Sequence, residues 1–172
     1  ITGASSDVGT SLIRRVYRPG DRVIAQGAGD LSALYELKKE VDDLLLIDAD
    51  LSDISAIRLF VQQLEGQPCP THFVHLPALR VVNTRYKNFD FDRYLLDLNV
   101  QLQSAILLTQ SILPKMAKAK FGRVLFMLTS YLTSVPPKNV SAYMVAKSAL
   151  AGLARSLAID FAKDGVTVNS VL

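Results

Sequence analysis

Short apolar runs alternate along the chain with segments in which apolar residues recur every three or four positions. The first pattern is typical of buried strands and the second of amphipathic helices. Their alternation predicts an α/β fold in which right-handed helical crossovers join parallel strands into one doubly wound sheet. The predicted strands are Arg22–Gln26, Leu44–Asp48, Phe73–Leu76, Arg123–Leu128 and Val166–Leu172.

The intervening segments carry helix signals. Val8, Leu12 and Val16 lie four residues apart and mark one face of a helix that ends at Pro19-Gly20. Ligands of such sheets bind at the carboxyl ends of the strands, so functional residues are expected in the loops that follow them. The other predicted helices run from an Asp30 cap to about Lys39, onward from an Asp53 cap, from Asp92 to about Met116, and over Ala142–Lys163.

The composition is that of one globular domain. The chain has 172 residues, of which 49% are apolar and 20% charged, and this excludes a disordered or fibrous protein. The net charge of +3 is small and scattered, so neither nucleic acid nor a membrane is an expected partner. No apolar run approaches the ~18 residues that a membrane-spanning helix requires.

Cys69 is the only cysteine, so no internal disulfide forms and a reducing, cytoplasmic location is expected. The chain opens at Ile1 without an initiator methionine or signal peptide, and it closes on Leu172 within an apolar, strand-like run. Both ends are therefore expected to be cut from a longer chain.

Three features carry candidate chemistry. The small residues of the loop Thr2–Gly9 lead into a helix, which favours a bound phosphate group, although a tight strand-to-helix turn has the same composition. Tyr143 and Lys147 share a helix face through their i, i+4 spacing, and an ammonium lowers the pKa of a phenol from about 10. Such pairs are also common on solvated helices. Ser130 follows a predicted strand, where its hydroxyl either holds a carbonyl oxygen or forms a turn.

Together these residues resemble the short-chain dehydrogenase/reductase family, in its 3-oxoacyl-reductase-like branch. The shared pattern is Thr2-Gly3 with Gly9, then Asn99, then Ser130 thirteen residues before Tyr143-x-x-x-Lys147. The resemblance covers essentially the whole chain and includes Asp50-Leu51-Ser52-Asp53. It implies a single NAD(P)-binding, Rossmann-like domain over residues 1–172, in which the first strand and the C-terminal lid of that fold are missing.

The resemblance also implies a role for each matching position. Tyr143 would be the general acid or base at the substrate oxygen, and Lys147 would lower its pKa and bind the nicotinamide ribose. Ser130 would orient the substrate carbonyl, and Asn99 would hold a water that leads protons to Lys147. The implied cofactor-binding residues, with Asp50 at the adenine, are Thr2, Gly3, Ser5, Ser6, Asp7, Val8, Gly9, Ala28, Asp50, Leu51, Pro77, Ala78, Tyr143 and Lys147.

The chain departs from the family pattern at three places. Asp7 stands where the family has its middle glycine, and we expect its carboxylate to point away from the cofactor diphosphate. His75-Leu76-Pro77-Ala78 replaces the usual Asn-Asn-Ala-Gly, and we expect His75 to be a structural replacement rather than a catalyst. Ser130 lies one residue later than usual counted from Gly122, which leaves Thr129 as a competitor.

The cofactor preference is read from the residues that follow the strand Arg22–Gln26. Family members that use NAD often carry an acidic residue at the end of this strand, to bind the ribose 2′-hydroxyl. Here Gln26, Gly27, Ala28 and Gly29 offer no carboxylate. NADP is therefore the expected cofactor, with NAD as the alternative.

The leading hypothesis is an oxidoreductase that transfers hydride between nicotinamide and a small-molecule carbonyl compound or secondary alcohol. The alternative is a non-catalytic binding or scaffold protein whose cofactor site has degraded, as Asp7, His75 and Pro77 suggest. Epimerisation of a sugar nucleotide is disfavoured, because that branch of the fold has a different glycine spacing. The resemblance further implies a homodimer or homotetramer, for which the candidate apolar residues, equally suited to a core, are Leu95, Leu98, Leu102, Ile106 and Leu107.

Overall fold

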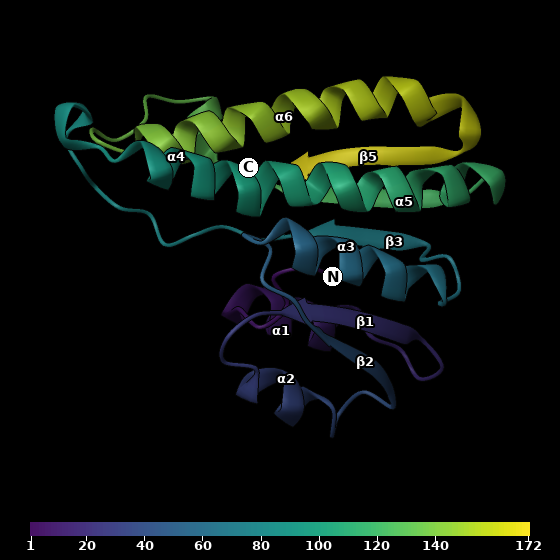
Figure 1. Ribbon diagram of the computed structural model, residues 1–172. Coiled ribbons are helices and arrows are strands. Elements are labelled where there is room, and N and C mark those ends of the chain that lie inside the picture. The colour runs from purple at the N-terminus through teal and green to yellow at the C-terminus, as the bar shows by residue number, and fades with distance from the viewer.

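The computed structural model describes residues 1–172 as parallel strands flanked by helices (Figure 1). One sheet pairs β1 with β2, and the other has the order β3-β4-β5; every pairing is parallel. The prediction of a parallel α/β fold is confirmed, and each strand lies within two residues of its predicted bounds. The strands are β1 (Arg22–Gly27), β2 (Asp43–Asp48), β3 (His72–His75), β4 (Gly122–Met127) and β5 (Val166–Val171).

The segment Ile1–Ala4 joins the two sheets. Thr2 forms a parallel bridge with His75 at the end of β3. On its other side the Ala4 amide donates to the Gln26 carbonyl of β1 at 2.8 Å, and the Gln26 amide donates to the Ile1 carbonyl at 2.9 Å. This segment therefore lies between β1 and β3 in the place of a strand and is hydrogen-bonded to both.

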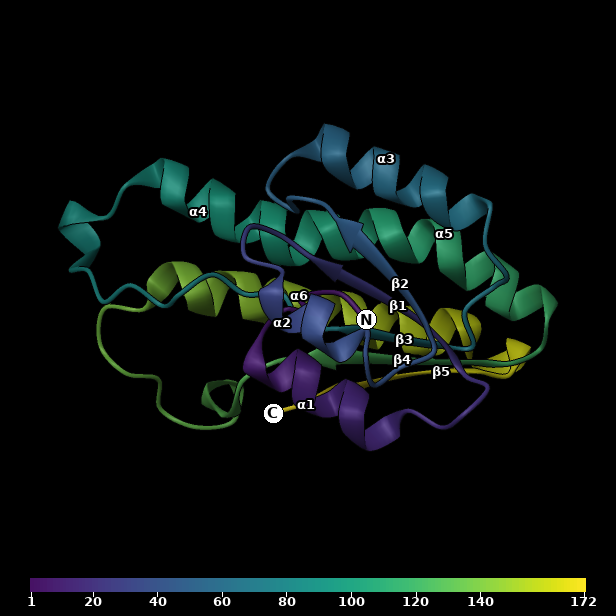
Figure 2. The ribbon, with the colours of Figure 1, turned by 90° about the horizontal axis from the view of Figure 1, so that it is seen from below.

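Helices cover both faces of the strands (Figure 2). On one face, α1 (Asp7–Val16) and α2 (Ser32–Leu37) enclose a cluster of eight buried apolar residues. The opposite face holds a larger cluster of 19 buried residues, which includes Phe60, Phe73 and Phe126. It is covered by α3 (Ile54–Glu65), α5 (Ser104–Lys118) and α6 (Ser141–Phe161). None of these helices is long and apolar enough to cross a membrane.

A π-helical turn interrupts the long helix that was predicted from Asp92 to about Met116. The observed helix begins as α4 (Phe91–Leu98), passes through the π turn Asn99–Gln103, and continues as α5 to Lys118. Within the turn the Ser104 amide donates to the Asn99 carbonyl, five residues earlier. Such widened turns insert one residue into a helix and frequently occur at functional sites.

The apolar face predicted for the first helix is wrong. Val8 and Val16 are 54% and 52% exposed, whereas Gly9 and Ile13 are buried. The cause is a close backbone approach: a Cβ on residue 9 would lie 2.6 Å from the Ala4 Cα. The absence of a side chain at Gly9 thus decides which side of α1 faces the protein.

The second helix is shorter than predicted and does not have Asp30 as its N-cap. It spans only Ser32–Leu37, and its N-cap residue is Leu31. The Asp30 carboxylate accepts a hydrogen bond of 2.9 Å from the Ser32 amide, which makes a turn that precedes the helix.

The close approach at Gly9 predicts the effect of adding one methyl group. We expect Gly9→Ala to lower the free energy of unfolding by about 1–3 kcal/mol, because α1 must move away from Ala4. The matched control is Gly152→Ala on α6, whose Cβ would meet nothing within 4 Å. That substitution should raise the free energy of unfolding by about 0.5–1 kcal/mol. Urea unfolding followed by circular dichroism measures both, and equal stabilities would contradict the inferred contact.

Candidate active site

The glycine loop, residues 2–9, is bonded to its surroundings on both sides. The Gly3 amide donates to the Gln26 side chain at 2.9 Å, and Gln26 in turn donates to the Ala49 carbonyl at 2.7 Å. Gly3 has a φ of +66° and lies against Pro77, whose nitrogen would be 3.1 Å from an added Cβ. The structure thus brings the first glycine of the predicted site against the segment that follows β3.

The loop leads into α1 with several unused amides. The Ser6 hydroxyl caps the helix by accepting from the Gly9 amide at 3.1 Å. The backbone amides of Ser5, Asp7 and Val8 donate to no group of the protein. Free amides at a helix N-terminus fit a phosphate group, because they donate hydrogen bonds and carry the positive end of the helix dipole.

Lys147 and Tyr143 lie side by side on α6. The Lys147 Nζ is 5.8 Å from the centre of the Tyr143 ring, as the i, i+4 spacing predicts. Lys147 is only 1% exposed, and its Nζ donates a 2.6 Å hydrogen bond to the carbonyl oxygen of Met127 at the end of β4. The ammonium is therefore held at the carboxyl end of a central strand, beside a half-buried phenol.

Burial lowers the pKa of Lys147 from 10.5 to about 8, and the Asp97 carboxylate opposes this shift. The shift arises because the charged form loses hydration inside the protein. With this pKa the ammonium is still mostly charged at neutral pH. It can therefore stabilise negative charge that develops on a neighbouring group.

Ser130 is exposed at the start of a short 3₁₀ turn, Ser130–Leu132, and its hydroxyl bonds no protein group. The competing Thr129 is buried, and its hydroxyl oxygen accepts from the Tyr131 amide at 3.4 Å. The turn packs against α6. Ser130 rather than Thr129 thus has a hydroxyl that is free to contact a ligand.

Asn99 is the first residue of the π turn, which packs against α6. Its side chain is partly exposed and bonds no protein group, while its carbonyl accepts from the Ser104 amide. The other predicted cofactor residues follow the strands: Ala28 after β1, Asp50 and Leu51 after β2, and Pro77 and Ala78 after β3. Since the strands are parallel, these positions share one edge of the fold (Figure 1).

Comparison with known proteins assigns this arrangement to a family. The sequence matches the family described as short chain dehydrogenase over residues 1–172. The chain belongs to the short-chain dehydrogenase family. The prediction of the family and of its Rossmann-like fold is therefore confirmed.

Relatives in the short-chain dehydrogenase family include oxidoreductase UcpA of Salmonella typhimurium, 27% identical over 99% of this chain and 66% of that protein. The 3-oxoacyl-[acyl-carrier-protein] reductase FabG of Rickettsia conorii is 28% identical over 99% of this chain and 69% of that protein. The chain thus spans about two thirds of the length of these relatives. A solved structure described as an NAD(P)-dependent gluconate 5-dehydrogenase from Beutenbergia cavernae, with bound NADP, is 26% identical with a TM-score of 0.88, covering 99% and 68% of the two chains.

His75 stands where the short-chain dehydrogenase pattern has an asparagine, and it is a neutral core residue. It is 1% exposed, and both ring nitrogens are bonded: Nδ1 to the Thr2 hydroxyl at 2.8 Å and Nε2 to the Gln101 carbonyl at 2.9 Å. Burial lowers the pKa of His75 to about 3; the bond to Gln101 opposes the shift and the nearby Lys147 charge adds to it. These contacts support a structural replacement.

Three predicted cofactor residues, Asp7, Leu51 and Asp50, differ in the exposure of their side chains. The Asp7 side chain is exposed and bonds no protein group. Its expected orientation, away from the cofactor diphosphate, stays a prediction. Leu51 was predicted to bind cofactor, but its side chain is buried in the larger apolar cluster, which leaves only its backbone to face a ligand. The Asp50 carboxylate is exposed and accepts from the Ser52 amide at 2.8 Å.

Two buried polar residues of the site region were missed by sequence reasoning. The Asp97 carboxylate accepts from Arg93 Nε at 3.2 Å and from Gln101 Nε2 at 3.2 Å. Gln101 is fully buried, and its Oε1 has no hydrogen-bond partner. Two polar residues at i, i+4 spacing within a leucine-rich helix were the signal that could have found them.

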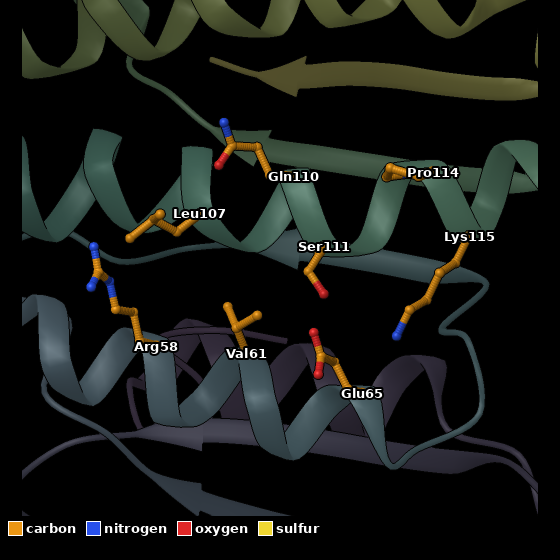
Figure 3. A pocket seen from close by; sticks show the side chains of 8 residues that line it. All are labelled: Arg58, Val61, Glu65, Leu107, Gln110, Ser111, Pro114 and Lys115. Carbon is orange, nitrogen blue, oxygen red and sulfur yellow. The ribbon is translucent and has the colours of Figure 1, made fainter.

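A surface hollow of about 480 Å³ lies elsewhere, between α3 and α5 (Figure 3). Arg58 and Glu65 line it from α3, and Gln110 and Lys115 line it from α5. It contains none of the predicted catalytic or cofactor residues. The hollow is therefore separate from the candidate active site.

The pKa of His75 makes part of the stability depend on pH. Between the unfolded value of 6.5 and the folded value of about 3, the unfolded chain binds the additional proton. The contribution of neutral His75 to the free energy of unfolding is therefore complete above the unfolded pKa. It is lost as the pH falls toward the folded pKa. We expect the titration of His75 to lower the free energy of unfolding by about 1.4 kcal/mol for each pH unit of this fall.

Urea unfolding between about pH 7 and 5 measures this slope before most carboxylates titrate. The control is His75→Asn, which removes the titrating ring and should reduce the slope by about this amount. A wild-type slope equal to that of the variant would contradict a neutral, buried His75.

Proposed function

We propose that this chain forms the catalytic part of an NAD(P)-dependent oxidoreductase, which transfers hydride between nicotinamide and a small-molecule carbonyl compound or secondary alcohol. The observation that carries this proposal is the buried Lys147 ammonium beside Tyr143, at the edge of the fold where the glycine loop presents free amides. The oxidoreductase and reductase names of the relatives support it. They favour an enzyme over the non-catalytic alternative.

Tyr143 is the proposed general acid and base. When bound, the cofactor supplies or accepts the hydride at the substrate carbon. Tyr143 then donates its hydroxyl proton to the carbonyl oxygen in reduction, or removes that proton in oxidation. A free phenol has a pKa of about 10, so the adjacent Lys147 charge is needed to make this transfer effective near neutral pH.

Ser130 and Asn99 complete the proposed site. The free hydroxyl of Ser130 donates a hydrogen bond to the substrate oxygen and so holds it near Tyr143. The Asn99 side chain, which makes no hydrogen bond to the protein, holds a water that passes protons toward Lys147. These roles follow the family pattern, and the arrangement of the two elements around α6 supports them.

NADP is the proposed cofactor, with NAD as the alternative. The Gln26 side chain is used inside the protein, and a Cβ at Gly27 would lie 2.7 Å from Leu31 Cδ2. The nearest following carboxylate, Asp30, accepts from the Ser32 amide. No acidic side chain is therefore placed at the end of β1 to bind a ribose 2′-hydroxyl or repel a 2′-phosphate. The similar structure described as a gluconate 5-dehydrogenase has NADP bound at low occupancy.

The proposed assembly is a homodimer or homotetramer in the cytoplasm, as the family resemblance and the single cysteine suggest. The candidate interface residues support it, because none of them is buried in the chain. Leu95 is exposed, and the partly exposed residues are Leu98, Leu102, Ile106 and Leu107.

Replacing Tyr143 by phenylalanine tests the proposed acid directly. We expect Tyr143→Phe to lower kcat by about a thousandfold, because the proton donor is lost while the ring remains. Cofactor affinity, measured by calorimetric titration, should change little. Turnover close to that of the wild type would overturn the role of Tyr143.

The lowered pKa of Lys147 predicts an alkaline limit to reduction. As the pH rises through about 8, the ammonium loses its charge and no longer attracts the negative charge that develops on the Tyr143 oxygen during proton transfer. We expect kcat for reduction to fall above this pH. Lys147→Arg, which stays charged, should be slower throughout but should lose this limb of the profile. A limb at the same pH in both proteins would contradict the assignment.

A cofactor titration distinguishes the enzyme from the scaffold alternative. Calorimetry of the full-length protein with NADPH and with NADH should give micromolar binding, tighter for NADPH. Absence of binding by both cofactors would overturn the proposed function and favour a degraded site around Asp7 and Pro77.

A further inference from the structure

His75 lies where three functional parts of the fold meet. It ends β3, it contacts the glycine loop through Thr2, and it contacts the π turn through the Gln101 carbonyl. The rings of Phe73 and Phe126 flank it, each with its centre 5.9 Å away. The imidazole is thus fixed by packing as well as by hydrogen bonds.

The two contacts define the protonation of the ring. A carbonyl oxygen can only accept, so Nε2 carries the proton that is donated to Gln101. Nδ1 is then an acceptor and receives the proton of the Thr2 hydroxyl. One neutral imidazole therefore donates on one side and accepts on the other.

No other side chain makes this connection. The remaining side-chain hydrogen bonds of the π turn are local to its helix: Ser104 Oγ donates to the Val100 carbonyl at 2.6 Å, and Gln101 Nε2 donates to Asp97 at 3.2 Å. The bond from His75 alone leaves that helix and leads toward the glycine loop.

We propose that His75 is a positioning residue that sets the π turn, and with it Asn99, relative to the glycine loop. The inference rests on the proposed function for its catalytic consequence: the cofactor and the Asn99 water are then fixed through one side chain. An asparagine at this position would carry both polar atoms on its γ-carbon, one bond short of where Nε2 lies. The histidine thus makes a contact that the family residue is too short to make in the same way.

Two substitutions separate the contacts. His75→Asn keeps an acceptor near the place of Nδ1 and loses the donor to Gln101, whereas His75→Gln keeps a donor near the place of Nε2 and loses the acceptor for Thr2. Phe73→Leu is the control, because it loosens the packing around the ring without removing a hydrogen bond. Urea unfolding of the three variants shows how far each change lowers the overall stability.

Amide hydrogen exchange of the full-length protein without cofactor is the first measurement. We expect the peptide that contains residues 99–104 to exchange about tenfold faster in His75→Asn, with the glycine loop unchanged. His75→Gln should show the reverse pattern, and Phe73→Leu should affect both segments alike. Wild-type exchange of the π turn in His75→Asn, or the same pattern in both His75 variants, would overturn the proposal.

Cofactor affinity and turnover form the second measurement. His75→Asn should lower kcat about tenfold with the NADPH dissociation constant close to that of the wild type. His75→Gln should mainly raise that dissociation constant. An unchanged kcat in His75→Asn would overturn the catalytic consequence. If the wild type binds no cofactor, the proposed function fails, while the exchange comparison still decides whether His75 positions the turn.

Discussion

The carbonyl of Met127 holds the Lys147 ammonium inside the protein. This carbonyl oxygen is available because the pairing of β4 with β3 ends one residue earlier. The Leu128 amide donates to Val171 on β5, so the preceding carbonyl points to the other side of β4, toward β3. There the ladder has already ended, because β3 pairs only as far as Phe126. Pro77, which has no amide hydrogen, follows soon after and cannot extend it.

The alternation of apolar runs and helical segments was enough to predict the strands and the large helices. These features depend on the spacing of apolar residues and on which of them are buried, and the sequence pattern indicates both. Helix ends and faces were less accessible. The face of α1 depends on how closely Gly9 approaches Ala4, and a count of apolar side chains does not register a missing one.

The residues around the candidate site divide in the same way. Tyr143, Lys147 and Ser130 could be proposed from the sequence because their spacing is characteristic of the family, and the structure places Lys147 beside Tyr143. Asp97 and Gln101 were missed because their burial comes from the packing of one long helix against α6. The π turn was missed too, since its extra residue leaves no separate signal in the apolar period.

The crowding at Gly27 limits how the dinucleotide preference of this chain could be redesigned. A side chain at position 27 would meet Leu31 and Ser5, and position 29 has a left-handed backbone that favours glycine. Ala28 is exposed, and its backbone has no such constraint. A switch of coenzyme engineered at this strand end is therefore best attempted at Ala28, where the structure accommodates aspartate or arginine without repacking of the interior.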